Sequence, residues 1–434
     1  MPQAEAFPVD VDREYSRTID FLYSFERFGI LLGLENISSL LAAIGNPQEL
    51  FRSVHVAGSN GKGSTSSLIE SMAGGSGLTT ALYTSPHLND FRERIRINGK
   101  FVSKEEIIGA TKKILPIYDH ERTTFFEYTT AIAFDCIAHA KPDLGIIEVG
   151  LGGRLDATNT IKPLVSVITD ISREHEDYLG VGIKAVATEK AGIIKENTPV
   201  VTGASRKEAR EVILSTASAL NAPVYEFGRE FRGTRTSLNT FDYRSSGMSL
   251  PGLRMAMTGA HQMKNASLAI RSVEELVRKG YKISPEAIRK AVETTQFPGR
   301  FELLRRNPDV IIDGAHTPEG MRLLKSALTK LYPLRNIFLL LGILKDKNVD
   351  TLVRTIVPIA KKVVCVAPHS DRSLEPKALA RKVGDMGAEA LAADSIEEGF
   401  MALMEEAGKD DAIVATGSLY MIGPVRRACG KSDE

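Results

Sequence analysis

The stretch of sequence that decides the fold runs from His55 to Ser67 and reads His-Val-Ala-Gly-Ser-Asn-Gly-Lys-Gly-Ser-Thr-Ser-Ser. It joins the end of an apolar strand to a glycine-rich loop with one lysine, and then to hydroxyl residues that enter a helix. In such a loop, backbone N–H groups surround an anion, the lysine adds a positive charge, and a serine hydroxyl reaches a phosphate-bound Mg²⁺. The sequence therefore predicts a phosphate-binding loop between a strand and a helix.

This loop departs from the strict phosphate-loop pattern. The residue after Lys62 is Gly63 rather than Ser or Thr, and the first glycine of the pattern would fall on Val56. An ordinary strand-to-helix turn made of small residues is the alternative interpretation. The loop residues expected to contact ATP are Asn60, Gly61, Lys62, Gly63 and Ser64.

The composition limits the classes of protein that fit. With 434 residues the chain is long enough for two domains, each with a buried core. The formal net charge of +1 gives no general affinity for nucleic acid or for an anionic membrane. The cysteines have no metal-site spacing, the N-terminus shows no targeting segment, and no apolar run is long enough to cross a bilayer. We therefore expect a reduced, cytoplasmic protein that captures anionic ligands through local groups.

Apolar strands alternate with helices along the first part of the chain. A mainly helical segment from Asp10 to Ile44 comes first, and Asn46-Pro47 ends it. Strands are expected at residues 54–57, 80–83, 144–149, 164–168 and 199–202. Strands separated by helices predict a parallel, doubly wound α/β sheet. Residues 225–257 carry Gly, Ser, Thr and Arg among short β-prone runs, which predicts a small antiparallel insertion before a helix resumes near His261.

A break within Gln-Phe-Pro-Gly-Arg, from Gln296 to Arg300, divides the chain, because Pro298 and Gly299 would end any helix that crossed it. The domains expected are therefore 1–297 and 298–434. Beyond the break, strands are expected at 310–313, 337–341, 362–366 and 412–415, with helices that begin near Pro318, Asp350, Pro376 and Ser395. This alternation predicts a second, smaller α/β domain.

Several polar side chains lie at or beyond the predicted strand ends. Glu148 lies in an apolar strand, where a carboxylate is costly to bury, so we expect it to bind Mg²⁺ directly or through water; a buried ion pair is the alternative. Ser85 follows another strand and either completes the coordination of that ion or caps the next turn. His175 follows a third strand and either binds a second metal or lies at the surface, since Mg²⁺ itself prefers oxygen ligands. The segments 313–316 and 416–418 also follow strands, where ligands bind to open parallel sheets, although ordinary turns fit them equally well.

The order of these motifs resembles the folylpolyglutamate synthases and dihydrofolate synthases, members of the Mur-type ATP-dependent amide ligases. After the phosphate loop come Thr-Ser-Pro-His-Leu from Thr84, Phe-Phe-Glu-Tyr-Thr-Thr-Ala from Phe125, Glu-Val-Gly-Leu-Gly-Gly-Arg-Leu-Asp-Ala-Thr-Asn from Glu148 and Glu-Lys-Ala-Gly-Ile-Ile-Lys from Glu189. His261-Gln262 with Asn265, Pro-Gly-Arg-Phe-Glu from Pro298, Asp-Gly-Ala-His from Asp313 and Thr-Gly-Ser-Leu-Tyr from Thr416 complete the series. The resemblance covers nearly the whole chain. It implies a phosphate-loop ATPase domain of Mur-ligase type with a parallel sheet, followed by a smaller Rossmann-like glutamate ligase domain.

The resemblance implies ATP-dependent ligation of L-glutamate to dihydropteroate, to reduced folates such as tetrahydrofolate, or to both. The acceptor carboxylate attacks the γ-phosphate of ATP, and the glutamate amine then displaces phosphate from the acyl phosphate. Lys62 and one Mg²⁺ held by Ser85 and Glu148, with Ser64 on the nucleotide side, would supply the positive charge that phosphoryl transfer needs. A second Mg²⁺ would bind His175.

The resemblance also assigns residues that spacing alone does not single out. Lys190 would otherwise pass as a solvated helix lysine, but it matches the lysine that CO₂ carbamylates in this family, which would turn it into an anionic ligand near the second metal. Domain closure on the nucleotide would bring His316 over the reaction site. Further ATP contacts are implied for Asn265, Arg300 and Asp313, and folate contacts for Phe125, Phe126, Glu127, Leu155, Asp156 and Ala157. The two phenylalanines fit a plain core role equally well.

Three departures from the commoner family pattern qualify these assignments. Ser59 replaces a threonine and keeps the hydroxyl. Arg-Glu-His replaces Leu-Asp-His before the second metal, so that Glu174 keeps an acid while Arg173 adds a charge. Thr317 replaces an asparagine after His316, which removes an amide beside the expected glutamate or nucleotide contacts.

Two other functions fit parts of the sequence. One is a Mur-type ligase that acts on a different carboxylate, against which Phe-Phe-Glu-Tyr-Thr argues. The other is a nucleotide switch that ligates nothing, against which the combination of Glu148, His175 and Lys190 with a complete second domain argues. Because the motifs need no second subunit, we expect a monomer.

Overall fold

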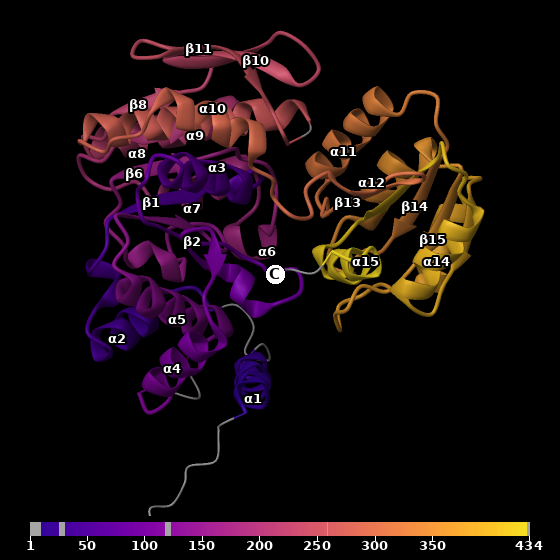
Figure 1. The fold of residues 1–434 in the computed structure, drawn as a ribbon, viewed down its shortest axis with the longest axis horizontal. Helices are drawn as coiled ribbons and strands as arrows, with labels where there is room; N and C mark the ends of the chain where they lie inside the picture. The colour runs from indigo at the N-terminus through magenta and orange to yellow at the C-terminus, as the bar shows by residue number, and fades with distance from the viewer. Residues whose placement is uncertain (1–9, 26–30, 118–122, 258, 432–434) are drawn as a thin grey trace, which may run out of the picture.

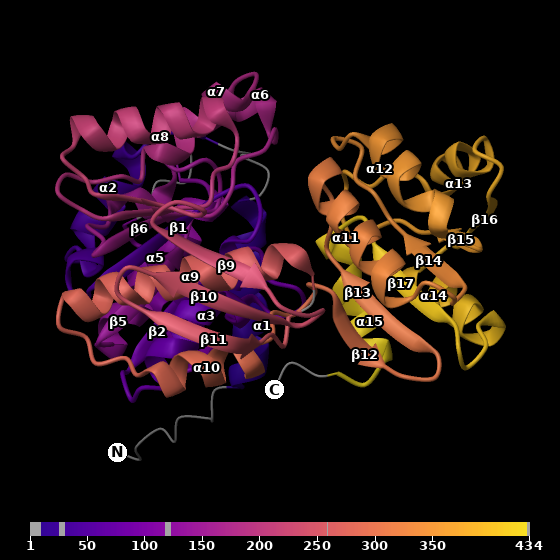
Figure 2. The ribbon, with the colours of Figure 1, turned by 90° about the horizontal axis from the view of Figure 1, so that it is seen from above.

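The computed structural model describes residues 10–25, 31–117, 123–257 and 259–431. The chain forms two α/β parts that lie side by side, and the second part begins after the Pro298-Gly299 break (Figures 1 and 2). No helix in these residues is long and apolar enough to span a membrane. The mainly helical lead-in is confirmed by α1 (Val11–Tyr23) and α2 (Glu35–Ala43), while residues 26–30 lie outside the described ranges.

The first part is built on an eight-stranded sheet in the order β4-β3-β2-β5-β1-β6-β7-β8. Its strands are β1 (Ser53–Ala57), β2 (Thr80–Tyr83), β3 (Ile95–Ile97), β4 (Lys100–Phe101), β5 (Leu144–Glu148), β6 (Val165–Ile168), β7 (Val200–Thr202) and β8 (Val224–Glu226). The predicted parallel arrangement is confirmed for the six strands β2, β5, β1, β6, β7 and β8. It is wrong at the edge of the sheet, where β3 and β4 pair antiparallel. There Asn98 and Gly99 both have positive φ, as a two-residue hairpin turn requires.

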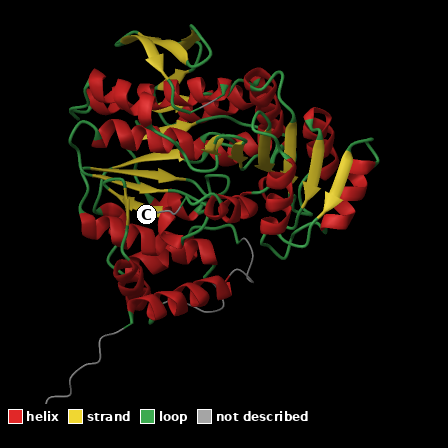
Figure 3. Cartoon of the chain, turned by 45° about the vertical axis from the view of Figure 1, so that its right-hand side comes forward, coloured by secondary structure: helices red, strands yellow, loops and turns green. Residues whose placement is uncertain are grey.

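Helices cover both faces of this sheet (Figure 3). One face packs against α3 (Lys62–Gly74) and α9 (Ala260–Arg278), with α10 (Pro285–Thr294) against α3. The other face packs against α5 (Phe125–Ala140), α7 (Ile183–Ala191) and α8 (Lys207–Ala219), with α1, α2 and α4 (Lys104–Ile114) beyond α5. The central strands β1 and β5 are buried along their whole length, so the polar residues at their ends have a rigid base.

A three-stranded antiparallel sheet lies outside α9 and α10, at the top of Figure 1. It consists of β9 (Phe231–Arg235), β10 (Thr240–Ser245) and β11 (Ser249–Arg254), which confirms most of the predicted insertion. The prediction is wrong at residues 225 and 226, because they belong to β8, which extends the main sheet parallel to β7.

The second part has a six-stranded sheet in the order β12-β13-β17-β14-β15-β16. Its elements are β12 (Glu302–Arg305), β13 (Asp309–Asp313), α11 (Pro318–Leu331), β14 (Ile337–Leu341), α12 (Val349–Ile356), β15 (Lys362–Cys365), α13 (Pro376–Gly384), β16 (Glu389–Ala392), α14 (Ile396–Glu406), β17 (Ala412–Thr416) and α15 (Ile422–Ala428). Helices α11, α12 and α13 pack on one face, and α14 and α15 pack on the other. The predicted α/β alternation is confirmed, and the two strands it missed, β12 and β16, are both edge strands; β12 runs antiparallel to β13.

Buried histidines give the fold a dependence on pH. Burial lowers the pKa of His55 to about 3, and His55 is charged in the unfolded chain below its ordinary value of 6.5. The unfolded chain therefore binds the extra proton, so this contribution to stability is complete above pH 6.5 and is lost as the pH falls toward 3. Between pH 7 and pH 5 the unchanged protein is therefore expected to lose about 2 kcal/mol of unfolding free energy that the His55→Gln variant does not lose.

Urea unfolding of both proteins at the two pH values measures this shift. His139→Gln is the matched control, because the side chain of His139 is 73% exposed. Equal destabilisation by His55→Gln at both pH values would contradict the prediction.

Candidate active site

The loop between β1 and α3 has the backbone geometry of an anion-binding turn. Gly58 and Gly61 have positive φ values of 152° and 84°, and the hydroxyl of Thr169 donates to the carbonyl of Asn60 at 2.6 Å. The ammonium of Lys62 turns back onto the loop and donates to the carbonyl of Gly58 at 3.0 Å. The ammonium is therefore held beside the N-terminus of α3, where backbone N–H groups are free to bind an anion.

Amide side chains from the start of α9 lie against the loop. The amide of Gln262 donates to the hydroxyl of Ser64 at 3.4 Å, and Asn265 donates to Gln262 at 3.0 Å. The side chain of Asn265 also lies directly beside Gly61, where a Cβ atom would overlap it. The structure therefore brings Asn265 to the phosphate loop, from which it is about two hundred residues distant in the sequence.

Glu148 lies at the end of β5, in register with Val56 of β1. Its side chain is buried, and its Oε2 atom has no hydrogen-bond partner among the described residues. Burial raises the pKa of Glu148 to about 7, against the opposing charge of Lys62 and a backbone N–H of Ser85. An orphaned carboxylate oxygen in a buried site fits a hard divalent cation such as Mg²⁺.

Lys190 and Glu174 form a buried ion pair that lines the same cavity as Glu148. The distance from Nζ to Oε1 is 2.6 Å, and their side chains are only 2% and 10% exposed. Burial opposes the charge of Glu174, but the ammonium of Lys190 outweighs it and holds the pKa of Glu174 at about 2. His175 follows Glu174 in the chain and has a positive φ of 47°. In the described chain, no group of three His, Cys, Asp or Glu side chains is arranged to hold a metal. As an ammonium, Lys190 does not fit a second cation here.

The link between the two parts is held by hydrogen bonds around Asp313. This carboxylate accepts from the backbone N–H groups of Phe301 and Ala315, each at 2.8 Å. Gly299 has a positive φ of 71° and accepts from the N–H of Gly314 at 2.9 Å. Asp313 therefore fixes the start of the second part, and the side chain of Arg300 lines the cavity between the parts.

His316 is neutral and has a defined tautomer. Its Nδ1 atom lies 2.8 Å from the carbonyl of Gly314, which can only accept, so Nδ1 carries the proton and Nε2 has a free lone pair. Burial lowers the pKa of His316 to about 4. At neutral pH the ring is therefore a hydrogen-bond acceptor on the cavity side.

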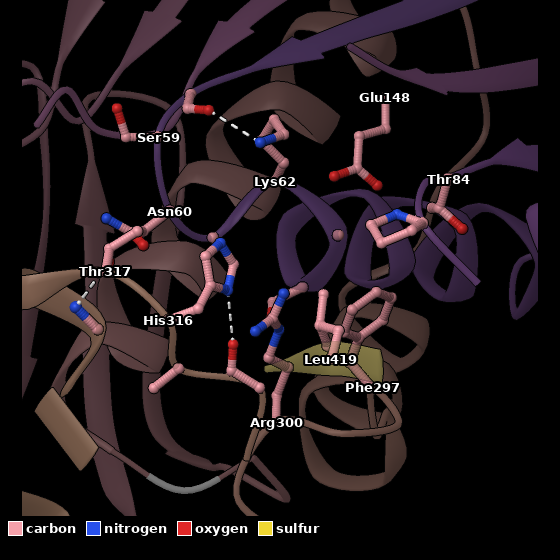
Figure 4. A pocket seen from close by; sticks show the side chains of 18 of the residues that line it. Ser59, Asn60, Lys62, Thr84, Glu148, Phe297, Arg300, His316, Thr317 and Leu419 are labelled. Atoms are coloured by element: carbon pink, nitrogen blue, oxygen red, sulfur yellow. Dashed lines mark hydrogen bonds between the residues drawn. The ribbon is translucent and has the colours of Figure 1, made fainter. Parts of the chain in front are cut away.

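A cavity of about 250 Å³ lies between the two parts and contains most of the predicted site. In Figure 4, Lys62 and Glu148 lie on one side, and Arg300, His316 and Leu419 face them from the other. The predicted residues that line it are Asn60, Gly61, Lys62, Gly63, Ser64, Ser85, Glu148, His175, Lys190, Asn265, Arg300, Asp313 and His316. Strand ends and helix starts from both parts of the chain thus meet at one site.

The six residues that the resemblance implies for folate binding do not line this cavity. The ring of Phe125 stacks on Tyr23, with centroids 5.7 Å apart, and the ring of Phe126 stacks on Tyr83, at 6.4 Å. Leu155 is half-buried and Ala157 is buried.

Both carboxylates in this set already bond within the fold. Glu127 completes a capping box at the start of α5, with Thr124. Asp156 accepts from the N–H of Leu151 at 2.8 Å and from the N–H of Thr158 at 3.0 Å. Through Leu151, Asp156 anchors the glycine loop that follows Glu148. The hydroxyl of Thr158 in turn bonds to His55 of β1 at 2.9 Å.

Sequence reasoning missed three contributors to the site. Thr169 and Ser172 hold the phosphate loop from the far side, and the hydroxyl of Ser59 accepts from the N–H of Ser172 at 3.0 Å. Both follow β6, so their position at a parallel strand end was the signal that could have found them. Arg96 also lines the cavity, and nothing in its local sequence distinguishes it from a surface arginine.

Gly63 connects the phosphate loop to the link between the parts. A Cβ atom here would overlap the ring of Phe297. We expect Gly63→Ala to lower the free energy of unfolding by about 1–3 kcal/mol through overpacking. At Gly74 of the same helix the nearest atom would be Thr80 Oγ1 at 3.7 Å, so Gly74→Ala is expected to stabilise by about 0.5–1 kcal/mol. Urea unfolding measures both variants, and equal stability would contradict the prediction.

Models of two domain families match successive parts of this chain. The Mur ligase middle domain matches residues 56–273, and the Mur ligase, glutamate ligase domain matches residues 299–419. The chain is 32% identical over 428 residues to the dihydrofolate synthase/folylpolyglutamate synthase of Bacillus subtilis, covering 95% of this chain and 98% of the relative. It is 33% identical over 437 residues to the folylpolyglutamate synthase of Lacticaseibacillus casei, covering 96% and 100%.

Solved structures of folylpolyglutamate synthases are also similar to this chain over nearly its whole length. The Mycobacterium tuberculosis folylpolyglutamate synthase complexed with ADP superposes with a TM-score of 0.91 at 31% identity, covering 98% of this chain and 100% of that one. Escherichia coli FolC in complex with DHPP and ADP gives 0.89 at 27% identity, with 99% of each chain covered. A bifunctional folylpolyglutamate synthase/dihydrofolate synthase with Mn, AMPPNP and L-glutamate bound gives 0.86 at 27% identity, covering 95% and 98%.

Proposed function

Because this chain belongs to the folylpolyglutamate synthase/dihydrofolate synthase family of Mur ligases, we propose that it ligates L-glutamate to both dihydropteroate and reduced folates through an acyl phosphate. The chain is an ATP-dependent glutamate ligase, as its family is. The observation that carries the proposal is the position of Lys62 and the orphaned carboxylate of Glu148 in one interdomain cavity, with His316 opposite. We divide the chain into domains 1–297 and 298–434, on either side of the Phe297-Pro298 link.

The residues of the loop act on the nucleotide. The glycine-rich turn and Asn60 to Ser64 cradle the phosphates, and Lys62 neutralises charge on the transferred group. Asn265 and Arg300 contact the nucleotide from the two sides of the cleft. Asp313 orders the link through its two backbone bonds, which supports a role in nucleotide-driven closure, and its direct contact with ATP remains a prediction from the resemblance.

We propose one Mg²⁺ held by Glu148 and Ser85, with Ser64 on the nucleotide side. Bound there, the ion would supply positive charge to the phosphate oxygens of ATP. The orphaned Oε2 atom of Glu148 fits this role, and a related structure binds Mn with AMPPNP. Water exclusion by the second domain protects the acyl phosphate, while the free Nε2 of His316 accepts a hydrogen bond from the attacking amine.

We propose that the Lys190 amine adds to CO₂ and loses a proton, giving a carbamate anion. Burial lowers the pKa of Lys190 and so favours the neutral amine that this addition needs. The product would carry a negative charge beside Glu174, which requires a cation such as a second metal at His175. Carbamylation is therefore expected only together with metal binding.

For the acceptor, Phe125, Phe126 and Leu155 to Ala157 remain a prediction from the resemblance. The caps made by Glu127 and Asp156 support a role in shaping this region rather than a direct contact. A monomeric, cytoplasmic enzyme likewise stays a prediction from the sequence.

The test measures ADP release with ATP, Mg²⁺ and L-glutamate, and compares dihydropteroate, tetrahydrofolate and no acceptor. Glutamate-dependent turnover with both acceptors is the expected result. Turnover with dihydropteroate alone would reduce the proposal to a dihydrofolate synthase, and turnover with tetrahydrofolate alone to a folylpolyglutamate synthase. No stimulation by either acceptor would overturn the proposal and favour a Mur-type ligase for another carboxylate.

A further inference from the structure

One arginine in the wall of the cavity forms no ion pair with any residue that the structure describes. Arg96 lies in β3, opposite Leu82 of β2 and Phe101 of β4. Its guanidinium lies over the ring of Phe101, 5.4 Å from the centroid, and makes no hydrogen bond or ion pair with any described residue. Its Nε atom is buried and has no hydrogen-bond partner in the described part of the chain. A buried guanidinium nitrogen without an acceptor is rare enough to need an explanation.

The carboxylates nearest to Arg96 are occupied by other donors. Glu93 accepts from the backbone N–H groups of three successive residues, at 2.7–2.8 Å, and so shapes the loop from Leu88 to Asp90. Glu70 accepts from the hydroxyl of Thr80 at 3.1 Å. Neither comes within 4.0 Å of the Arg96 nitrogens, the limit for an ion pair, so both contribute only at longer range.

A second arginine, from the other domain, acts on Arg96 through its charge. Arg426 of α15 is held by Glu302, with Nε to Oε1 at 3.1 Å, and its charge acts on Arg96 across the domain boundary. Leu88, Phe297 and Pro298 line the same cavity as Arg96. Two guanidinium groups, one from each side of the domain boundary, therefore act on each other near this part of the cavity wall.

We propose that Arg96 binds a carboxylate of a glutamyl group in this cavity. The inference rests on the proposed function, because both substrates of a glutamate ligase can carry such a group. Incoming L-glutamate has two carboxylates, and the glutamyl tail of a reduced folate has a free α-carboxylate, whereas dihydropteroate has no tail. The Nε–H and Nη–H donors of arginine match a carboxylate in a two-bond fork, which a lysine does not reproduce.

The experiment compares Arg96→Gln and Arg96→Lys with the unchanged enzyme, with each acceptor in turn. Lys100→Gln is the matched control, because it removes an exposed positive charge from the neighbouring strand β4. Loss of the fork is expected to raise one KM by about tenfold or more in Arg96→Gln, with kcat changed less than about threefold. Arg96→Lys is expected to restore only part of the loss. Thermal unfolding confirms that each variant is folded.

The two sources of the carboxylate give different results. A higher KM for L-glutamate with both acceptors places the incoming amino acid at Arg96. A higher KM for tetrahydrofolate, with dihydropteroate kinetics unchanged, places the glutamyl tail there. The proposal is overturned if no KM in Arg96→Gln moves further than in Lys100→Gln. Absence of turnover in the unchanged enzyme would instead contradict the proposed function itself.

Discussion

Replacing Lys62 by alanine is expected to lower kcat by about a thousandfold or more while the protein stays folded. The ammonium is fixed by the carbonyl of Gly58 at 3.0 Å and faces the cavity at the start of α3. Negative charge builds up on the phosphoryl oxygens during transfer. In the Lys62→Ala variant the loop offers only backbone dipoles to stabilise this charge, in place of a full positive charge. Phosphate release with saturating ATP, acceptor and L-glutamate measures the effect.

Lys264→Ala is the matched control for this prediction. Lys264 lies on α9 near the same loop and pairs with Asp170 at 3.4 Å, but it does not line the cavity. We expect its kcat to stay within about threefold of the unchanged enzyme. A Lys62→Ala enzyme with more than a tenth of full activity would remove Lys62 from the mechanism.

The parts of the site that are local in sequence could be predicted. Gly61, Lys62 and Ser64 lie within one turn, so their spacing alone places them around an anion. Glu148 stood out because an apolar strand rarely carries a carboxylate, and its orphaned oxygen agrees with that argument. Strand alternation likewise predicted both sheets, since apolar runs and turn residues are properties of short segments.

The rest depends on tertiary contacts that spacing does not encode. A carboxylate that caps a turn and one that binds a ligand look alike in a sequence, so the capping bonds of Glu127 and Asp156 became visible only in the fold. The partner of Lys190 is Glu174, which reaches it from the preceding segment. Arg96 could not be singled out from the sequence either. Its lack of an ion pair depends on the fold, in which other donors already occupy the nearby carboxylates of Glu70 and Glu93.

The Glu174–Lys190 pair connects the proposed mechanism to the proposed carbamylation of Lys190. In the unmodified protein the two charges balance each other in a buried place, so no cation is needed. Conversion of Lys190 to a carbamate changes the net charge of the pair from zero to minus two, which a buried site tolerates only with a metal or other cations nearby. CO₂ and the second divalent ion are therefore expected to act cooperatively. A ¹³C signal from labelled CO₂ bound to the protein should grow on addition of Mg²⁺.

Lys190→Ala is expected to reduce kcat by at least about a hundredfold, and small carboxylates such as formate or acetate should restore part of the activity. The added carboxylate would occupy the space of the missing carbamate, and its binding requires the divalent ion, since Glu174 would otherwise repel it. Leaving Glu174 buried without a partner also costs about 3–5 kcal/mol of stability. The double variant Lys190→Ala with Glu174→Ala removes that charge and serves as the folded control. Turnover with and without acetate, at low and high Mg²⁺, measures the rescue; full activity in Lys190→Ala without any added carboxylate would contradict the role of the carbamate.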